Sequence, residues 1–430
     1  MAAHCGPNNY TIVQEGEEAI ANRDGSPGRT DTAWRVHYQC NGAGIGAFAG
    51  GACHDDVTIE VVRSGCLACL VMVTASACGR VSFDLLADGG DAVADGDTAP
   101  RVFGYLANQA STTITAVSVN LADGSLSETP GSPFELGGTP EEVAASATTL
   151  YVTTKNPGQV IAFHIDSTTG SLTRLNTLPC GTLPDALAVH PDGYLYVLDS
   201  MTPATYGFAI AADGSLAGIP GSPWSHGGGP AEVAIAIHPN GRWVYTLDEN
   251  FPGAFLVYTV GAGGALTEDT SITWNYMATA EDIAIESSGR HGFLAPLGSA
   301  VPAFTIDPAT GAVSTTPGSP FNGPNNSVLN IALDPTGQFL LLANNGSNTI
   351  SAYAVAGTGA LSPVSGSPIN TGGSLIWDVA TSPLGGYVYA NDGDTLSVLH
   401  VDNTGFDERF RGIQFPGMSQ PWAMTFVRMN

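Results

Sequence analysis

Acidic and aromatic side chains recur at one position of a pattern that repeats between residues 101 and 430. Five of seven copies of a short Ala- and Ile-rich segment open with a carboxylate, and none opens with a basic residue. Residue types that bind metal ions, stack on sugars or transfer protons therefore occupy similar points of the repeat. The opening pairs are Glu141-Glu142, Asp185-Ala186, Ala231-Glu232, Glu281-Asp282, Leu329-Asn330, Trp377-Asp378 and Trp422-Ala423.

The first hypothesis for these residues is a calcium site. Calcium prefers carboxylate and amide oxygens, and a bound divalent ion could polarise a substrate carbonyl and activate water. Separate, solvated turn carboxylates are the simpler interpretation, because residues of different repeats can lie too far apart to share one ion. The candidate ligands are Glu142, Glu232, Asp282 and Asp378, with Asn330 as a further oxygen donor.

A second hypothesis is a neutral sugar-like ring stacked on Trp377 and Trp422, because aromatic faces suit such rings. Packing between neighbouring repeats is the simpler role for these tryptophans. A third hypothesis has no chemistry: the repeats form a scaffold that binds a protein partner through its loops. The candidate ligand-binding residues are Glu142, Asp185, Asn330, Trp377, Asp378 and Trp422.

The elements that position these residues follow from a repeated phrase of a glycine, a small residue and an apolar residue. Successive copies are 46, 44, 50, 47, 48 and 46 residues apart. A period near 47 fits a four-stranded propeller blade. The copies begin at Gly124, Gly170, Gly214, Gly264, Gly311 and Gly359, with a weaker copy at Gly405.

Each repeat contains four predicted strands. A strand such as 196–199 is followed by an alternating strand, by the Gly-x-Leu strand that ends near Gly-Ser-Pro, and by a small-residue strand that suits the crowded axis. The first repeat, near Val102, lacks this inner strand, and residues 422–427 supply one with nothing after it. We therefore predict an all-β, seven-bladed β-propeller over residues 101–430, closed by the C-terminal strand completing the first blade.

The first hundred residues differ from the repeats and hold six of the seven cysteines. Within 61–78, Arg63 precedes an apolar run that ends at Ser76-Ala77-Cys78, the arrangement of a short secretory signal. It resembles a bacterial lipoprotein signal in which Cys78 would carry the lipid. Residues 79–100 are expected to form an acidic, glycine-rich linker. These features predict an extracytoplasmic protein of the cell envelope, lipid-anchored or secreted.

A signal peptide normally stands at the start of a chain, but residues 1–60 precede this one. We interpret them as a non-native N-terminal extension or a disordered segment, with translation starting near Val61. A small zinc-binding domain is the alternative, although its residues match no standard zinc spacing. Its candidate ligands are His4, Cys5, His37, Cys40, Cys53 and His54.

The net charge of the chain limits its partners. The formal net charge is −26, and residues 79–430 contain nine Lys and Arg against 31 Asp and Glu. Such a surface disfavours nucleic acid and anionic lipid headgroups, and it also suffices to keep a secreted protein soluble. We expect a small neutral ligand or a protein partner, no nucleic acid, membrane contact only through a lipid anchor, and a monomer.

The repeats resemble those of the lactonase-type seven-bladed β-propellers. The shared motifs are the Gly-Ser-Leu strands, the turns of the type 190–193 (His-Pro-Asp-Gly) and the Tyr-Val strands. This family includes 6-phosphogluconolactonase and the carboxymuconate-lactonising enzyme. The resemblance implies a site in the axial funnel with Arg and His after a Gly-Pro. Here Ala231 and Glu232 follow Gly229-Pro230, and Glu249 corresponds to the family's acidic residue. Without arginine forks, phosphorylated substrates are not expected.

These observations favour an exported ring that binds a ligand or partner through its central funnel. The alternative is a lactone hydrolase that opens sugar lactones at the carboxylate-lined rim, with calcium as the candidate cofactor. Its candidate catalytic residues are Glu232, Glu249 and Asp282. His190 and His238 occupy a repeated turn position and are predicted to be structural.

Overall fold

The structure, a computed structural model, describes residues 10–20, 31–40, 57–63, 68–73, 100–225, 232–248, 254–272, 274–275, 279–323, 327–373 and 375–429. The chain divides into two compact units, Met1–Gly96 and Asp97–Asn430. Among the described residues, no helix is both long enough and apolar enough to cross a membrane.

The N-terminal unit contains one antiparallel sheet with the strand order β1-β2-β3-β4. Its strands are β1 (Tyr10–Ile20), β2 (Asp31–Cys40), β3 (Val57–Arg63) and β4 (Ala68–Val73). The last two strands overlap the predicted signal segment, which stays a prediction. Cys78 and most of the predicted linker lie outside the described residues, as do His4, Cys5, Cys53 and His54.

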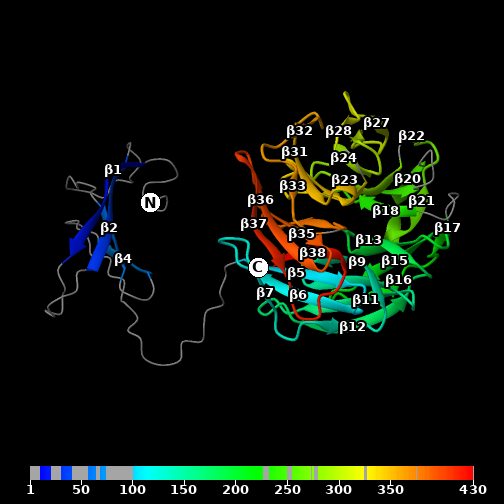
Figure 1. Cartoon of the computed structure of the whole chain (residues 1–430), viewed down its shortest axis with the longest axis horizontal. Coiled ribbons are helices and arrows are strands. Elements are labelled where there is room, and N and C mark those ends of the chain that lie inside the picture. Colours follow the sequence, from blue (N-terminus) through cyan, green and yellow to red (C-terminus); the bar gives the residue numbers. More distant parts are fainter. Residues whose placement is uncertain are drawn as a thin grey trace, which may run out of the picture. The chain divides into compact units, whose positions relative to one another are not determined.

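The second unit is a ring of seven antiparallel blades, as predicted from the repeats (Figure 1). Blade 1 combines the last strand of the chain with the first strands of the ring. Its strands are β38 (Pro421–Met429), β5 (Arg101–Asn108), β6 (Thr113–Val119) and β7 (Leu126–Glu128), with β8 (Phe134–Glu135) beside β6.

Blades 2 to 4 follow in chain order, each from its inner to its outer strand. Blade 2 is β9 (Thr139–Ser146), β10 (Thr149–Lys155), β11 (Gln159–Ile165) and β12 (Leu172–Pro179). Blade 3 is β13 (Pro184–His190), β14 (Tyr194–Asp199), β15 (Ala204–Ile210) and β16 (Leu216–Gly218), with β17 (Trp224–Ser225). Blade 4 is β18 (Glu232–Ile237), β19 (Trp243–Asp248), β20 (Ala254–Val260) and β21 (Leu266–Glu268), with β22 (Trp274–Asn275).

Blades 5 to 7 complete the ring. Blade 5 is β23 (Ala280–Ile285), β24 (His291–Pro296), β26 (Ala303–Ile306) and β27 (Val313–Thr315), next to the pair β25 (Ala300–Val301) and β28 (Phe321–Asn322). Blade 6 is β29 (Val328–Leu333), β30 (Phe339–Asn344), β31 (Thr349–Val355) and β32 (Leu361–Pro363), with β33 (Ile369–Asn370). Blade 7 is β34 (Val379–Thr381), β35 (Tyr387–Asp392), β36 (Thr395–Asp402) and β37 (Gly405–Ile413).

The ring closes through its two ends. β38 pairs with β5 from Pro421 opposite Asn108 to Met429 opposite Arg101, so the C-terminal strand is the inner strand of blade 1. Each inner strand also contacts the inner strand of the next blade, including β34 with β38 and β38 with β9. The predicted closure is therefore confirmed.

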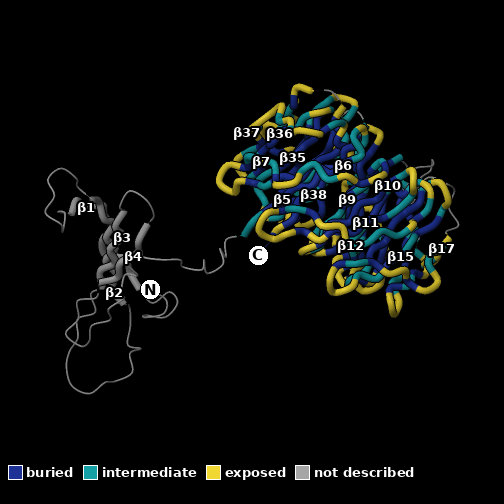
Figure 2. The backbone as a smooth tube through the Cα atoms, turned by 90° about the horizontal axis from the view of Figure 1, so that it is seen from below, coloured by how far each residue is buried: buried dark blue, intermediate teal, exposed yellow. Residues whose placement is uncertain are grey.

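The hydrophobic core lies between the blades. The described residues form seven buried clusters, and each combines side chains of two adjacent blades. Burial follows the strands, and exposure is concentrated in the turns (Figure 2). Each blade therefore depends on both neighbours to bury its two faces, which is why only a closed ring leaves no apolar face open.

The repeated glycine is needed for two physical reasons, which Gly264 illustrates. Its φ of +80° favours glycine, and a Cβ there would lie 2.6 Å from the ring of Tyr194 in the preceding blade. Its carbonyl accepts a hydrogen bond from the Tyr196 hydroxyl at 2.7 Å. The other three such bonds are Tyr105 to Gly170 (2.9 Å), Tyr151 to Gly214 (3.2 Å) and Tyr245 to Gly311 (3.2 Å).

We call these four bonds the tyrosine latches, and they join blades 1 to 5. Blades 5 and 6 have Phe293 and Leu341 at the tyrosine position, and the buried hydroxyl of Tyr389 in blade 7 has no partner. The Nε2 atoms of His190 and His238 lie 2.7 and 2.9 Å from the carbonyl oxygens of Gly241 and Gly289 in the next blade. Both histidines are therefore structural, as predicted.

Candidate functional site

A cavity of about 490 Å³ lies at the centre of the ring. The opening segments of the inner strands of all seven blades contribute to its wall, so the cavity lies on the ring axis. The structure therefore brings most of the predicted site residues together. Those lining it are Glu142, Asp185, Asp282, Asn330, Trp377, Asp378 and Trp422, together with Glu141 and Glu281.

A local irregularity at the start of the inner strands positions these side chains. In six blades the register of the inner strand shifts by one residue against the next strand, near positions 141, 185, 233, 281, 329 and 422. A bulge of this kind leaves one residue unpaired and redirects its side chain. In blade 5, for example, Ala280 pairs with Pro296 and Asp282 with Ala295, which leaves Glu281 between them.

The register corrects one expectation from the sequence. Glu232 pairs with Asp248, the position that Ala280 occupies opposite Pro296, so Ala234 rather than Glu232 is the structural equivalent of Asp282. The extra residues after Pro230 made the sequence alignment misleading. When the opening pairs of the inner strands are aligned by register, blade 4 has Val233-Ala234, so four blades rather than five carry a carboxylate there. The side chain of Glu232 and the whole of Glu249 lie outside the described residues, and their catalytic roles stay predictions.

Three of the site residues hold the blades together across the cavity wall. Asp282 Oδ2 accepts a hydrogen bond from the backbone N–H of Ile331 in the next blade at 3.0 Å. Asn330 Oδ1 accepts one from Val379 at 3.2 Å, and Asp378 Oδ2 accepts one from Met424 at 2.6 Å. We call these the channel latches. Sequence reasoning missed this role, although the signal was the recurrence of an oxygen-bearing side chain at one repeat position in blades 5, 6 and 7.

The cavity wall raises the pKa of its acids. Burial raises the pKa of Asp378 to about 7 against the hydrogen bond from Met424, and the charge of Asp282 adds to the increase. Burial likewise raises the pKa of Asp282 to about 7, although the N–H groups of Ile331 and Ile283 favour its charged form. Carboxyls with such pKa values exchange protons near neutral pH.

The pKa of Glu142 is raised as well. Burial, followed by the negative charge of Asp378, raises the pKa of Glu142 well above its usual value, and its hydrogen bond from Val143 N at 2.9 Å opposes this only in part. The negative charge of Asp378 therefore opposes the ionisation of Glu142. Two carboxyls that interact in this way lose their protons in separate steps, so that one can act as an acid and the other as a base.

The remaining carboxylates of the wall have local partners. Glu141 forms an ion pair with Lys155, the single lysine of the chain, and accepts a hydrogen bond from Gln109 Nε2 at 3.2 Å. The Ser200 hydroxyl donates to Asp185, whose pKa is raised by burial. A basic group therefore does lie beside the rim, contributed by β10 rather than by an inner strand, but it is neutralised by Glu141.

Trp377 and Trp422 form the aromatic part of the wall. Their ring centroids are 4.6 Å apart with planes inclined by 32°, and Trp422 is 37% exposed. They come from blades 7 and 1, which are adjacent because of the ring closure. An exposed, rigid indole next to polar groups suits the apolar face of a sugar ring.

The described residues contain no group of three or more His, Cys, Asp or Glu side chains close enough to hold a metal ion. The channel latches give a reason: Asp282 and Asp378 each direct one oxygen, Oδ2, to a backbone N–H group of the next blade rather than to a common point. The calcium site built on Glu142, Glu232, Asp282 and Asp378 stays a prediction, because the side chain of Glu232 is not described.

Seven blades around a cavity of acidic and aromatic residues define a propeller with a candidate site on its axis. The model of the family described as "Lactonase, 7-bladed beta-propeller" matches residues 143–293, which run from β9 of blade 2 into β24 of blade 5. The resemblance to the lactonase-type seven-bladed β-propellers is thereby confirmed. No curated protein sequence gives a significant match.

Solved structures support the same fold. The periplasmic gluconolactonase of Pseudomonas aeruginosa superimposes with a TM-score of 0.66 at 19% identity, covering 76% of this chain and 99% of that one. A protein from Lactobacillus plantarum gives 0.64 at 21% identity, covering 76% and 100%. A candidate 6-phosphogluconolactonase from Bacteroides uniformis gives 0.64 at 17% identity, covering 76% and 99%. At these identities the likeness concerns the fold.

Proposed function

We propose that the ring is a lactone hydrolase that opens a neutral sugar lactone in the axial cavity. The observation that carries this proposal is that two carboxyls with raised pKa values, Glu142 and Asp378, line one cavity beside an exposed tryptophan and interact electrostatically. The match to the lactonase family and the likeness to a periplasmic gluconolactonase support it.

In the proposed reaction Asp378 is the general base and Glu142 the general acid. The ionised Asp378 takes a proton from water while the water oxygen attacks the lactone carbonyl carbon. The tetrahedral intermediate then collapses, the bond between the carbonyl carbon and the ring oxygen breaks, and Glu142 protonates the departing alkoxide. The product is a hydroxy acid. Protonation steps of this kind contribute roughly 10²- to 10⁴-fold to a rate when the pKa of the base is near the working pH.

Asp378 is preferred over Asp282 as the base for two reasons. It directly follows Trp377, so it lies beside the surface on which the sugar would stack. Its charge also has the largest electrostatic influence on the pKa of Glu142. Asp282 shares the raised pKa and is the alternative base.

The acidic wall also supports a neutral substrate. Asp185, Glu281, Asp282 and Asp378 would repel a phosphate, and Lys155 is already paired with Glu141. The indole of Trp422 would instead contact the apolar face of an uncharged ring. A location outside the cytoplasm fits both the predicted signal at 61–78 and the periplasmic location in the name of one structural neighbour.

A binding module is the second candidate, because the same Trp377 and Trp422 pair could hold a sugar without turnover. The test is hydrolysis of gluconolactone and of its 6-phosphate by the wild-type protein, Asp378→Asn, Glu142→Gln and Asp282→Asn, with calcium and with a chelator. We expect turnover of the neutral lactone, with kcat/KM rising as pH increases through about 7, and a loss of about 10²-fold or more in Asp378→Asn.

Each other outcome is informative. A comparable loss in Asp282→Asn alone would assign the base to Asp282, and a loss in chelator restored by calcium would establish the metal-assisted route. Efficient turnover of the phosphorylated lactone would contradict the electrostatic selection. Binding of gluconolactone without turnover would leave the binding module as the function.

A further inference from the structure

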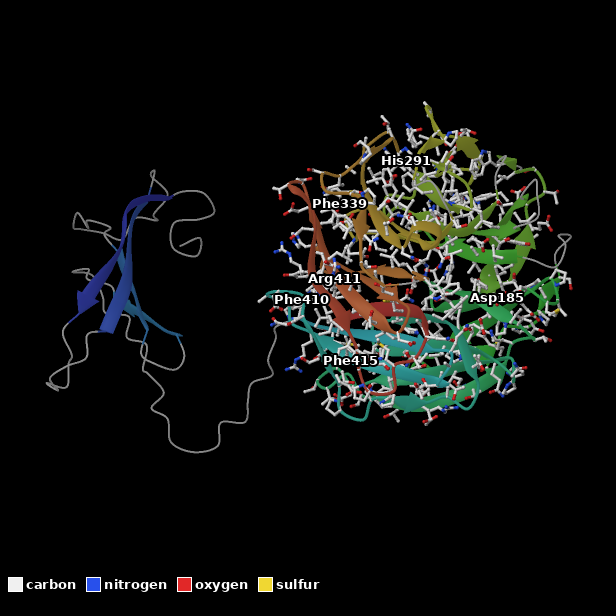
Figure 3. The ribbon with its side chains drawn as sticks, in the orientation of Figure 1. Asp185, His291, Phe339, Phe410, Arg411 and Phe415 are labelled. Atoms are coloured by element: carbon white, nitrogen blue, oxygen red, sulfur yellow. The ribbon has the colours of Figure 1, made fainter. Side chains whose placement is uncertain are left out.

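A second cavity of about 590 Å³ adjoins the axial one. Trp377 and Trp422 line both cavities, so their stacked indoles form a common wall. We call the second space the side cavity. Its other walls come from the segment after β33, the turn after β35 and β37, where Figure 3 labels Arg411 on blade 7. The wall residues used below are Thr371, Leu375, Asp392, Arg411 and Gln420.

The backbone of the side cavity is strained at two positions. Leu375 has a φ of +68° and Gln420 a φ of +47°, a region that costs an ordinary residue roughly 1–2 kcal/mol. Leu375 is also 49% exposed, so the fold gains little from its side chain. Glycine would suit position 375 better if only folding mattered. An exposed, strained leucine at a cavity wall therefore points to a contact with a ligand.

The polar groups of the wall favour a neutral, hydroxyl-rich ligand. Asp392 Oδ2 accepts a hydrogen bond from Gly373 N at 2.8 Å, whereas Asp392 Oδ1 and the Thr371 hydroxyl, both on buried residues, have no partner. The guanidinium of Arg411 is paired with Glu408, so it is not a free site for an anion. Acceptors and an indole without a free cation suit a sugar rather than a phosphate.

We infer that the side cavity is a subsite for a second neutral sugar, so that the preferred substrate is a disaccharide lactone. The lactone ring would lie in the axial cavity and the attached sugar in the side cavity, with Trp377 and Trp422 between the two. Both cavities, of about 490 and 590 Å³, are within the size of small-ligand pockets. This inference rests on the proposed lactone hydrolysis for the first ring only.

The test compares gluconolactone with its 4-O-glucosyl derivative as substrates for the wild-type protein and Leu375→Gly. We expect the wild type to prefer the disaccharide lactone by about tenfold or more in kcat/KM. Leu375→Gly should reduce this preference to near unity and keep or raise the melting temperature, because the strain is relieved. The matched control is Leu384→Gly, which removes a leucine that is 41% exposed and lines neither cavity.

Binding of the uncharged disaccharide 4-O-glucosylglucose, followed by tryptophan fluorescence, separates this inference from the proposed function. If no lactone is hydrolysed but the disaccharide binds and Leu375→Gly weakens its binding, the subsite stands and the lactonase proposal fails. If the wild type hydrolyses both lactones equally well, or Leu375→Gly retains the preference, the subsite is overturned and the lactonase proposal is unaffected.

Discussion

The two arcs of the ring differ in which of two repeated hydrogen bonds joins their blades. From blade 1 to blade 5 the blades are joined by the tyrosine latches, in which a tyrosine hydroxyl donates to a glycine carbonyl of the next blade. From blade 5 through blades 6 and 7 back to blade 1 they are joined by the channel latches, in which a carboxylate or amide oxygen accepts a hydrogen bond from an N–H group of the next inner strand. Among the described residues, these seven bonds serve the seven interfaces once each. The first kind is neutral over the whole physiological pH range, whereas two of the three channel latches ionise near pH 7.

This difference shows how a symmetric repeat can carry an asymmetric site. The tyrosine latches lie on the second strands of blades 1 to 4, so they leave the inner strands free. At the position of Asp282, blades 3 and 4 have only the alanines Ala186 and Ala234. The channel latches place carboxyls on the cavity wall, where burial makes them useful for proton transfer. Blades 5 to 7 therefore combine ring closure with the chemistry that we propose, at a cost in stability above neutral pH.

The largest expected effect is on the pH dependence of stability in the channel-latched arc. Because the pKa of Asp378 is raised from 3.8 to about 7, the native state holds a proton between these pH values that the unfolded state has lost. The stability contribution of the protonated group is thus present near pH 4 and is lost as pH rises through about 7. A pKa change of this size corresponds to on the order of 4 kcal/mol.

Asp378→Asn tests this expectation. The amide oxygen can still accept the Met424 N–H, as Asn330 does for Val379, but it cannot ionise. Denaturation from pH 4 to 8 should show a smaller decline in the free energy of unfolding than in the wild type, with the variant more stable at pH 8. Asp213→Asn, at an exposed turn of blade 3 where the pKa is lowered, is the control and should leave the decline between pH 5 and 8 unchanged. An identical decline in Asp378→Asn would contradict the link between this latch and pH.

A smaller effect is expected at the repeated glycine of the tyrosine-latched arc. Gly263 and Gly264 are neighbours with φ values of +74° and +80°, but a Cβ at Gly263 meets nothing within 4 Å, whereas one at Gly264 meets the Tyr194 ring at 2.6 Å. Gly263→Ala should cost about 1 kcal/mol of stability through backbone strain, and Gly264→Ala a further ~1–3 kcal/mol through overpacking. Equal losses in urea denaturation would show that the repeat preserves glycine for conformation alone.

The fold was predictable because the blade repeats its constraints. Three sequence features correspond to contacts in the structure. The glycine period near 47 and the repeated tyrosine correspond to bonds such as that of Tyr196 with Gly264, and the missing first inner strand corresponds to the pairing of β38 with β5. Local sequence and long-range contact agree in such a case. The residues of the axial cavity followed from the same reasoning, since the small-residue strand had to lie at the axis.

The chemistry of the site was less accessible from sequence. The position of Glu232 depends on strand register, which places it opposite Asp248, two residues before the equivalent of Asp282. The channel latches and the raised pKa values depend on burial and on N–H groups some 46 to 49 residues away, which no local motif encodes. The side cavity could not be predicted from the sequence, because Leu375 and Gln420 are distinguished by their positive φ angles, which no local motif specifies.

The smallest expected effect compares a tyrosine latch with its unused copy across the ring. Tyr196 donates to Gly264 O at 2.7 Å, whereas the buried Tyr389 hydroxyl in blade 7 has no partner. Tyr196→Phe should therefore cost about 1 kcal/mol, because it leaves a buried carbonyl unpaired, while Tyr389→Phe should be neutral or slightly stabilising, because it removes an unsatisfied polar group. Urea denaturation at one pH measures both. A loss at Tyr389 as large as that at Tyr196 would mean that blade 7 also uses Tyr389 as a latch, and the division of the ring into two arcs would fail.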